Sequence, residues 1–178
     1  MRKLTLQNGT AVLIRPANKS DAGALVELAD KMGGESDFLT FGRGEFSLTV
    51  EQEENYLANI SQRNNAVYLV AEISGEIVGT LSFSGGSRPR TAHAGEFSLS
   101  VLKKYWGNGI GTALTECLID WCGKTGIVRK INLRVRTDNY PAIHLYKKLG
   151  FSEAGTITRE MLIDGVFYDA LCLGYCVD

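Results

Sequence analysis

The chain has 178 residues, and its 19 lysines and arginines nearly balance its 20 aspartates and glutamates, for a formal net charge of −1. This balance excludes a general electrostatic attraction to nucleic acid or to an anionic membrane surface. A chain of this length is expected to fold as one domain, spanning residues 1–178, around one apolar core.

The sequence also favours a particular compartment. No apolar run is long enough for a membrane span, and residues 1–3 lead into polar residues rather than into the apolar core of a signal peptide. The four cysteines lack paired Cys-x-x-Cys spacing and are best explained as buried free thiols in a reducing compartment. These are Cys117, Cys122, Cys172 and Cys176. Because His93 and His144 are too few and too scattered for a metal site, we expect a cytoplasmic protein without a bound metal.

The first elements in chain order are a strand and two helices. Residues 10–15 predict a strand, and apolar residues at positions 22, 25, 28, 29 and 32 predict a helix. Thr49 and Gln52 form a capping box that opens a second helix. We expect the buried side of this second helix to carry Tyr56, Leu57 and Ile60.

The connection between these helices, residues 33–48, carries four glycines and three phenylalanines. Aromatic side chains on a glycine-rich connection can line the wall of a binding pocket or pack onto the core. Next, residues 66–73 and 76–84 predict a β-hairpin across Ser74 and Gly75, followed by a loop over residues 84–91.

A strand, a glycine-rich loop and a helix follow. Residues 96–101 alternate apolar and polar side chains, as in a half-buried strand, and apolar residues recur at helical spacing from Ile110 to Trp121. The intervening loop reads Trp106, Gly107, Asn108, Gly109, Ile110, Gly111, Thr112. Glycines at the start of a helix leave backbone N–H groups uncovered at the positive end of the helix dipole, which is a natural seat for a phosphate group.

The glycine loop fits neither of two common nucleotide motifs. A dinucleotide signature would need a glycine at Thr112, and no Lys-Ser/Thr pair follows for a P-loop. A Rossmann domain also places its glycine loop after its first strand, whereas about a hundred residues precede this one. On the loop alone, a phosphate site and a simple strand-helix turn without a ligand both remain open.

The last elements are a strand, a short helix and a closing hairpin. Residues 130–136 alternate as a strand with one polar face. The segment 139–151 then begins with a helix cap at Asn139 or Asp138, has Pro141 in the first turn and can end at Gly150 in the left-handed conformation. Residues 153–163 and 166–175 predict a hairpin across Asp164-Gly165, a type I′ turn sequence.

The glycine loop, followed by Asn139-x-x-Ala-x-x-Leu-Tyr146-x-x-x-Gly-Phe151, resembles the GNAT superfamily of acetyl-CoA-dependent N-acetyltransferases. The resemblance covers most of the chain, although Trp106 stands where the family pattern usually has Arg or Gln. It implies a mixed α/β (α+β) fold, with a mostly antiparallel, splayed sheet of about seven strands flanked by about four helices. Residues 17–62 carry no matching motif. Because this part of the chain shapes the acceptor site in the family, the resemblance does not identify the acceptor.

The resemblance also implies how acetyl-CoA binds. The strand ending at Leu99, Ser100 and Val101 would pair with the pantetheine arm as an added strand does. Backbone N–H groups of the glycine loop would hold the pyrophosphate. An N–H group near Leu99 would polarise the thioester carbonyl, as an oxyanion hole does.

Three side chains are candidates for roles at this site. Tyr146 matches the family position whose phenol protonates the leaving sulfur, and a phenol with a pKa near 10 is protonated at neutral pH. Asn139 matches a cofactor-contacting asparagine but is equally explained as a helix cap. Glu96 matches an acidic position that deprotonates the amine in related enzymes, although a bulge in its strand would turn the side chain away.

We expect an acyltransferase that acetylates a primary amine by direct transfer. The acceptor classes are small molecules, such as a polyamine, an aminoglycoside or an amino acid, and protein N-termini. A cationic acceptor could be attracted by carboxylates of the first half, which also read as ordinary surface charge: Glu35, Asp37, Glu45, Glu51, Glu53 and Glu54. A homodimer is compatible with the exposed edge of the closing hairpin. The alternative is a non-catalytic acyl-CoA-binding sensor or interaction module, which would not need Tyr146.

Overall fold

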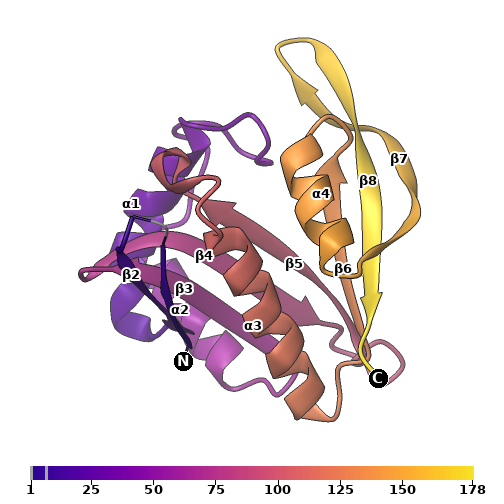
Figure 1. Cartoon of the computed structure of the whole chain (residues 1–178), viewed down its shortest axis with the longest axis horizontal. Coiled ribbons are helices and arrows are strands. Elements are labelled where there is room, and N and C mark those ends of the chain that lie inside the picture. The colour runs from indigo at the N-terminus through magenta and orange to yellow at the C-terminus, as the bar shows by residue number, and fades with distance from the viewer. Residues whose placement is uncertain (1, 7) are drawn as a thin grey trace.

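The computed structural model describes residues 2–6 and 8–178, which form a sheet with strand order β1-β2-β3-β4-β5-β6-β8-β7 (Figure 1). The strands are β1 (Arg2–Thr5), β2 (Ala11–Pro16), β3 (Ala66–Ile73), β4 (Glu76–Gly85), β5 (Ala94–Val101), β6 (Lys130–Arg136), β7 (Ser152–Ile163) and β8 (Val166–Cys176). Neighbouring strands are antiparallel, except for the parallel pair β5 and β6. The expected mixed, mostly antiparallel sheet is confirmed. Its eighth strand, missed in the sequence, is β1.

Helices cover both faces of the sheet. They are α1 (Ala22–Gly33), α2 (Val50–Ser61), α3 (Ile110–Thr125) and α4 (Tyr140–Lys148), with the short 3-10 turns η1 (Lys19–Asp21) and η2 (Lys103–Tyr105). Figure 1 shows α3 and α4 on the near face, and α1 and α2 behind the sheet. Phe83 of β4 is fully buried and meets Trp121 of α3 edge to face, with ring centroids 6.2 Å apart. Alternating side chains of β4 therefore build the core beneath α3.

Local sequence signals account for where several elements begin and end. The capping box of Thr49 and Gln52 opens α2, and the Asn139 side chain accepts a hydrogen bond from the Ala142 N–H at the start of α4. Gly150 ends the α4 segment with a φ of +93°. Asp164 and Gly165 both have positive φ, as a type I′ turn requires.

Two burial predictions need correction. Leu57 and Ile60 are buried on α2 as expected, but Tyr56 is 39% exposed. The third buried residue of this helix is instead Glu53, which lies one turn before Leu57. All four cysteines are free thiols, but only Cys122 is fully buried. Cys117 and Cys172 are partly buried, and the expectation of burial is wrong for Cys176, which is exposed although its neighbour Val177 is buried in the core. No helix in residues 2–6 and 8–178 is long and apolar enough to cross a bilayer.

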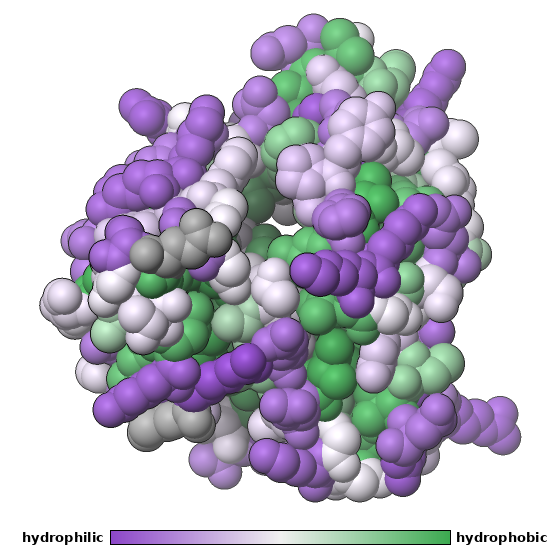
Figure 2. Space-filling model, in the orientation of Figure 1, coloured by the Kyte–Doolittle hydropathy of each residue, from purple (hydrophilic) through white to green (hydrophobic). Residues whose placement is uncertain are grey.

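The sheet divides between β5 and β6. These strands pair only from Ala94–Lys130 to Glu96–Asn132, and beyond that point β5 stays with β4 while β6 stays with β8. Figure 2 shows the surface hollowed where the strands separate, between the start of α3 and α4. The expected splay is therefore present, and it creates an opening that connects the two faces of the sheet.

Candidate active site

The β5 strand directs alternate backbone groups into the opening. The Gly86 N–H donates to the Ala94 carbonyl at 3.0 Å, and the Leu102 N–H donates to the Val78 carbonyl at 2.9 Å. Because hydrogen bonds between antiparallel strands use every second residue, the even-numbered residues of β5 pair with β4. The backbone groups of the three odd-numbered residues beyond the split point toward the opening: Phe97, Leu99 and Val101.

This alternation separates the three strand residues that the sequence assigned to the cofactor. The N–H and C=O groups of Leu99 and the N–H group of Val101 face the opening, where a ligand amide can pair with them. The backbone of Ser100 is turned toward its partner Thr80 on β4. The Val101 carbonyl accepts a hydrogen bond from the Trp106 indole at 2.6 Å. Trp106 thus closes the end of the open edge, and 44% of this residue is exposed.

The glycine loop presents bare donors at the start of α3. Gly107 and Gly109 have φ values of +73° and +84°, and the first helical hydrogen bond runs from the Ala113 N–H to the Gly109 carbonyl at 3.0 Å. The N–H groups of the first helical residues therefore have no carbonyl of the helix to bind. Those residues are Ile110, Gly111 and Thr112. Gly109 has no side chain to cap them, and η2 contributes Lys103 and Lys104 nearby, so the loop is suited to an anion.

Two further residues of this loop determine its shape and the space beside it. The Asn108 side-chain amide donates to the Trp106 carbonyl at 3.0 Å, which ties the turn to itself. At Gly111, an added Cβ would lie 3.4 Å from Leu145 of α4 and 3.5 Å from Leu99 of β5. A longer side chain at this position would therefore project between β5 and α4, where the opening lies.

Tyr146 lies beside the opening on the α3/α4 face. It is 6% exposed, and its ring packs edge to face on Phe97 and Phe151 at centroid distances of 5.7 and 5.8 Å. Burial raises the pKa of the Tyr146 phenol above its ordinary value, which already keeps a phenol protonated at neutral pH. The Asn139 side-chain oxygen caps α4 by accepting from the Ala142 N–H at 3.3 Å, so its amide NH₂ is the group it can offer to a ligand.

Glu96 lies at the split of the sheet but on the opposite face from Tyr146. The β4–β5 register is unbroken from Gly79–Val101 to Gly85–Gly95, so alternation places Glu96 on the α1/α2 face. Its carboxylate accepts a hydrogen bond from the Arg134 Nε at 2.8 Å, and Arg134 also pairs with Glu160 of β7. The hydrogen bond to Glu96 raises the pKa of the Arg134 guanidinium. The side chains of Glu96 and Arg134 are about half exposed, at 47% and 48%.

A pocket of about 470 Å³ lies on this second face, and the sequence pointed to only one of its walls. It lies between residues 34–49, which connect α1 to α2, and the turn end of the β7–β8 hairpin. Its lining includes four carboxylates, contributed by Asp37, Glu45, Glu160 and Asp164. The glycines and phenylalanines of the connection were the signal for a pocket wall. Nothing in the sequence showed that the hairpin forms the opposite wall.

Comparisons with known proteins agree with this geometry. Residues 36–151 match the model of the acetyltransferase (GNAT) family. The L-amino acid N-acetyltransferase AaaT of Escherichia coli (strain K12) is 36% identical over 111 residues, which cover 62% of this chain and 68% of the relative.

Solved structures extend the likeness to nearly the whole chain. The crystal structure of a GNAT-family acetyltransferase from Streptococcus pneumoniae superposes with a TM-score of 0.91 and 34% identity, over 94% of this chain and 99% of that one. The structure of yncA from Salmonella typhimurium, solved with its cofactor acetyl-CoA, has a TM-score of 0.82 and 21% identity, over 94% of both chains.

The residues present suit the cofactor that this family uses. An open strand edge can pair with amides, and bare N–H groups at a helix start can hold phosphates. Both features occur here within one stretch, from Phe97 to Thr112. With its splayed sheet and its matching sequence, the chain is an acyltransferase that uses acetyl-CoA and belongs to the acetyltransferase (GNAT) family.

Proposed function

We propose that the protein transfers the acetyl group of acetyl-CoA to the primary amine of a small, positively charged molecule. The observation that carries this proposal is the position of Glu96, which lies at the split between β5 and β6 and is linked through Arg134 to Glu160 of the carboxylate-lined pocket, while the donor-lined loop lies on the other face of the sheet. An amine that reaches Glu96 from the side of the pocket would meet a thioester placed in the opening from the opposite face of the sheet.

The roles of the protein groups follow from where they lie. When bound, acetyl-CoA supplies an activated acetyl thioester. The N–H groups of Ile110, Gly111 and Thr112 would hold the pyrophosphate, with the amide of Asn139 as a further contact. The backbone N–H of Leu99 would polarise the thioester carbonyl, because it points into the opening.

Two side chains would move the protons. Tyr146 would donate a proton to the departing sulfur from the α3/α4 face, because its phenol is protonated at neutral pH. Glu96 would accept the proton that the amine loses, directly or through a water molecule, from the α1/α2 face. The pairing of Glu96 with Arg134 would fix the direction of its carboxylate.

The charge of the pocket supports a cationic acceptor, such as a polyamine. Its described lining contains the four carboxylates named above and neither lysine nor arginine. Of these four, Glu45 accepts a hydrogen bond from the Gly42 N–H, and Glu160 pairs with Arg134. Two other carboxylates that the sequence suggested for a cationic acceptor make different contacts. Glu54 pairs with Lys19, and Glu35 accepts a hydrogen bond from the Lys103 N–H. An amino acid or a protein N-terminus is the second acceptor class.

The test is thiol release from acetyl-CoA across a panel of spermidine, L-leucine and a peptide with a free N-terminal alanine. We expect acceptor-dependent release, fastest with spermidine. Calorimetry on the same protein would measure coenzyme A binding separately. Tight binding of coenzyme A without release in the presence of any amine would contradict the proposal and support a non-catalytic binding module.

Three broader expectations stay predictions. The single sheet supports one domain over residues 1–178. A homodimer is supported by exposed apolar side chains on the closing hairpin, and light scattering would measure it. These side chains are Ile157, Leu162, Val166 and Phe167. The cytoplasmic location would be checked by fractionating cells that express the protein.

A further inference from the structure

Arg136, at the end of β6, is a buried arginine that contacts four other residues. Its side chain is 7% exposed, and its Nε and one terminal nitrogen donate to the two carboxylate oxygens of Asp138 at 2.8 and 2.6 Å. The other terminal nitrogen donates to the Asp37 backbone carbonyl at 2.9 Å. Its Cζ lies 3.8 Å from the centre of the Tyr168 ring and 4.7 Å from that of Phe38. All three guanidinium nitrogens therefore have partners.

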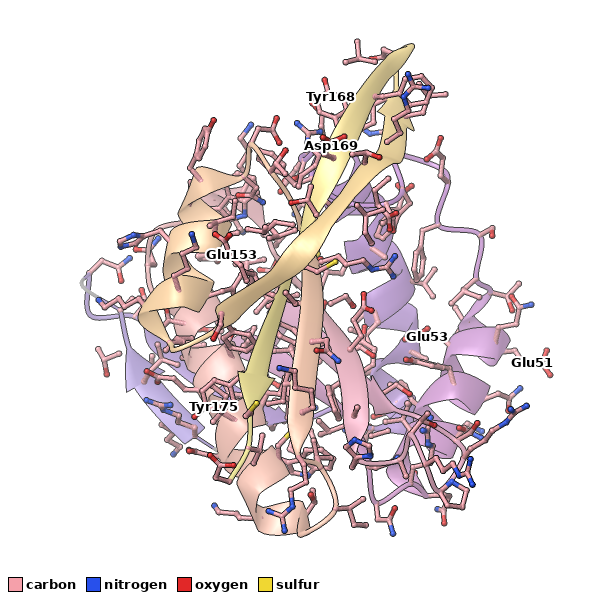
Figure 3. The ribbon with its side chains drawn as sticks, turned by 90° about the vertical axis from the view of Figure 1, so that its right-hand side faces the viewer. Glu51, Glu53, Glu153, Tyr168, Asp169 and Tyr175 are labelled. Atoms are coloured by element: carbon pink, nitrogen blue, oxygen red, sulfur yellow. The ribbon has the colours of Figure 1, made fainter. Side chains whose placement is uncertain are left out.

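These contacts join parts of the chain that belong to different halves of the split sheet. Asp37 and Phe38 lie in residues 34–49, which follow α1. Tyr168 lies on β8, near the turn end of the hairpin (Figure 3), and Asp138 precedes α4. Since β5 and β6 no longer pair at this level, Arg136 provides a direct tie between the two halves on the α1/α2 face.

The other hydrogen bonds that residues 34–49 make to distant residues connect the segment to the half of the structure that contains α1 and η2. The Gly44 N–H donates to the Asp30 side chain of α1 at 2.7 Å, and Glu35 accepts from the Lys103 N–H of η2 at 2.9 Å. The segment has no helix or strand of its own to hold its shape. Among the described residues, the hydrogen bond that ties this segment to the half of the sheet containing β8 is the one from Arg136 to the Asp37 carbonyl, and the Arg136 guanidinium also stacks on Phe38.

The acidic pocket lies between the two parts that Arg136 joins. Asp37 lines the pocket from the segment, and Glu160 and Asp164 line it from the hairpin. Any movement of the segment away from β8 would widen the pocket and separate these carboxylates. Arg136 itself does not line the pocket, so it would affect a bound molecule only by fixing the positions of the residues that do.

We propose that Arg136 is a positioning residue for the acceptor: it holds residues 34–49 against β8 and so sets the width of the acceptor pocket. This inference rests on the proposed function, because it takes the pocket as the acceptor site. A lysine at this position keeps the charge but cannot replace the planar, multidentate and stacked contacts of a guanidinium.

The test compares Arg136→Lys with the wild type in two measurements. The first is hydrogen–deuterium exchange of the unliganded protein, where amides of residues 34–49 should exchange at least about tenfold faster while those of α3 stay unchanged. The second is steady-state kinetics with spermidine and L-leucine. We expect the acceptor KM to rise about 10- to 100-fold, because bonds to charged groups are lost. The acetyl-CoA Kd and kcat should stay within about twofold of the wild type.

Arg159→Lys is the matched control, because Arg159 lies 4.9 Å from the ring of Phe167 on the same hairpin, outside the pocket. It should leave both measurements unchanged. Phe38→Leu is the substitute variant if Arg136→Lys does not fold, because it removes one aromatic contact of Arg136 from residues 34–49. It should change both measurements in the same direction as Arg136→Lys, by a smaller factor.

Unchanged exchange in residues 34–49 would overturn the proposal, as would a loss of kcat or acetyl-CoA affinity with an unchanged acceptor KM. If the wild type acetylates no amine of the panel, the proposed function fails, and the acceptor role of Arg136 fails with it. The exchange measurement would then still decide whether Arg136 holds the segment.

Discussion

Phe97 of β5 and Tyr146 of α4 pack edge to face across the line where the sheet divides, with ring centroids 5.7 Å apart and an interplanar angle of 78°. The two residues come from the two halves of the sheet that separate after Glu96. The backbone of Phe97 faces the opening while its ring holds the Tyr146 ring in place. A side chain fixed by packing in this way is suited to a reaction that requires a proton donor in a defined position.

Tyr146→Phe should lower kcat by about 10²-fold, because general acid catalysis typically contributes factors of about 10²–10⁴. Phenylalanine keeps the ring contacts with Phe97 and Phe151. Acetyl-CoA affinity and the free energy of unfolding should therefore stay close to the wild type. Steady-state kinetics and calorimetric titration with acetyl-CoA would measure the two effects.

Tyr175→Phe is the control for this exchange. The Tyr175 ring packs on the other side of the cluster, 5.3 Å from Phe151, and we expect kcat within about twofold of the wild type. A Tyr146→Phe protein with wild-type turnover would show that the phenol only packs and does not donate a proton.

Glu96→Gln should change how the rate depends on pH. If Glu96 accepts the proton of the amine, its loss leaves only the fraction of acceptor that is already neutral in solution. The value of kcat/KM should then fall about 10²-fold near pH 7 and recover as the pH rises toward the pKa of the acceptor amine. A pH–rate profile would measure this, and a profile identical to that of the wild type would remove Glu96 from the mechanism.

Glu153→Gln controls for the loss of a paired surface carboxylate. Glu153 pairs with Lys147 and is 54% exposed, away from the split of the sheet. Because exposed ion pairs contribute about 0–1 kcal/mol, both exchanges should change stability little. A difference in their pH–rate profiles would therefore come from the position of Glu96.

The sequence predicted the elements that local patterns specify and missed contacts between distant segments. The capping box at Thr49, the left-handed Gly150 and the turn at Asp164 are each fixed by a few neighbouring residues, and the structure has all three. The tie from Arg136 to Asp37 joins residues far apart in the sequence, and no short pattern encodes it. The face on which Glu96 lies depended on whether β5 has a bulge, which only the register with β4 could show.

Gly109→Ala should weaken coenzyme A binding and destabilise the protein by about 1–2 kcal/mol, because a residue with a Cβ is strained at a φ of +84°. The strain would shift the backbone N–H groups of Ile110, Gly111 and Thr112 from the positions in which they can bind a phosphate group. Gly123→Ala in the same helix is the control: nothing lies within 4 Å of its added Cβ, so it should stabilise α3 by about 0.5–1 kcal/mol. Calorimetry and chemical denaturation would separate binding from folding, and equal affinities for the two variants would argue against the loop as the phosphate site.

Glu53 is a buried carboxylate on α2, only 2% exposed, that points toward the sheet, whereas Glu51 on the same turn points away (Figure 3). Burial raises the pKa of Glu53 above its ordinary value. The folded state therefore binds this proton more tightly than the unfolded state does. The free energy of unfolding should accordingly fall as the pH rises from the ordinary glutamate pKa through the raised one.

Glu53→Gln removes the buried charge and should remove this part of the pH dependence. Relative to the wild type, the variant should gain about 0.5–1 kcal/mol of unfolding free energy between pH 4 and pH 7, measured by urea denaturation at both values. Glu51→Gln removes the same charge from the same helix end without relieving burial, and should instead lose about 0.3–1 kcal/mol at pH 7 through the helix dipole. If both variants shift in the same direction, burial of the Glu53 carboxylate is not what opposes folding at neutral pH.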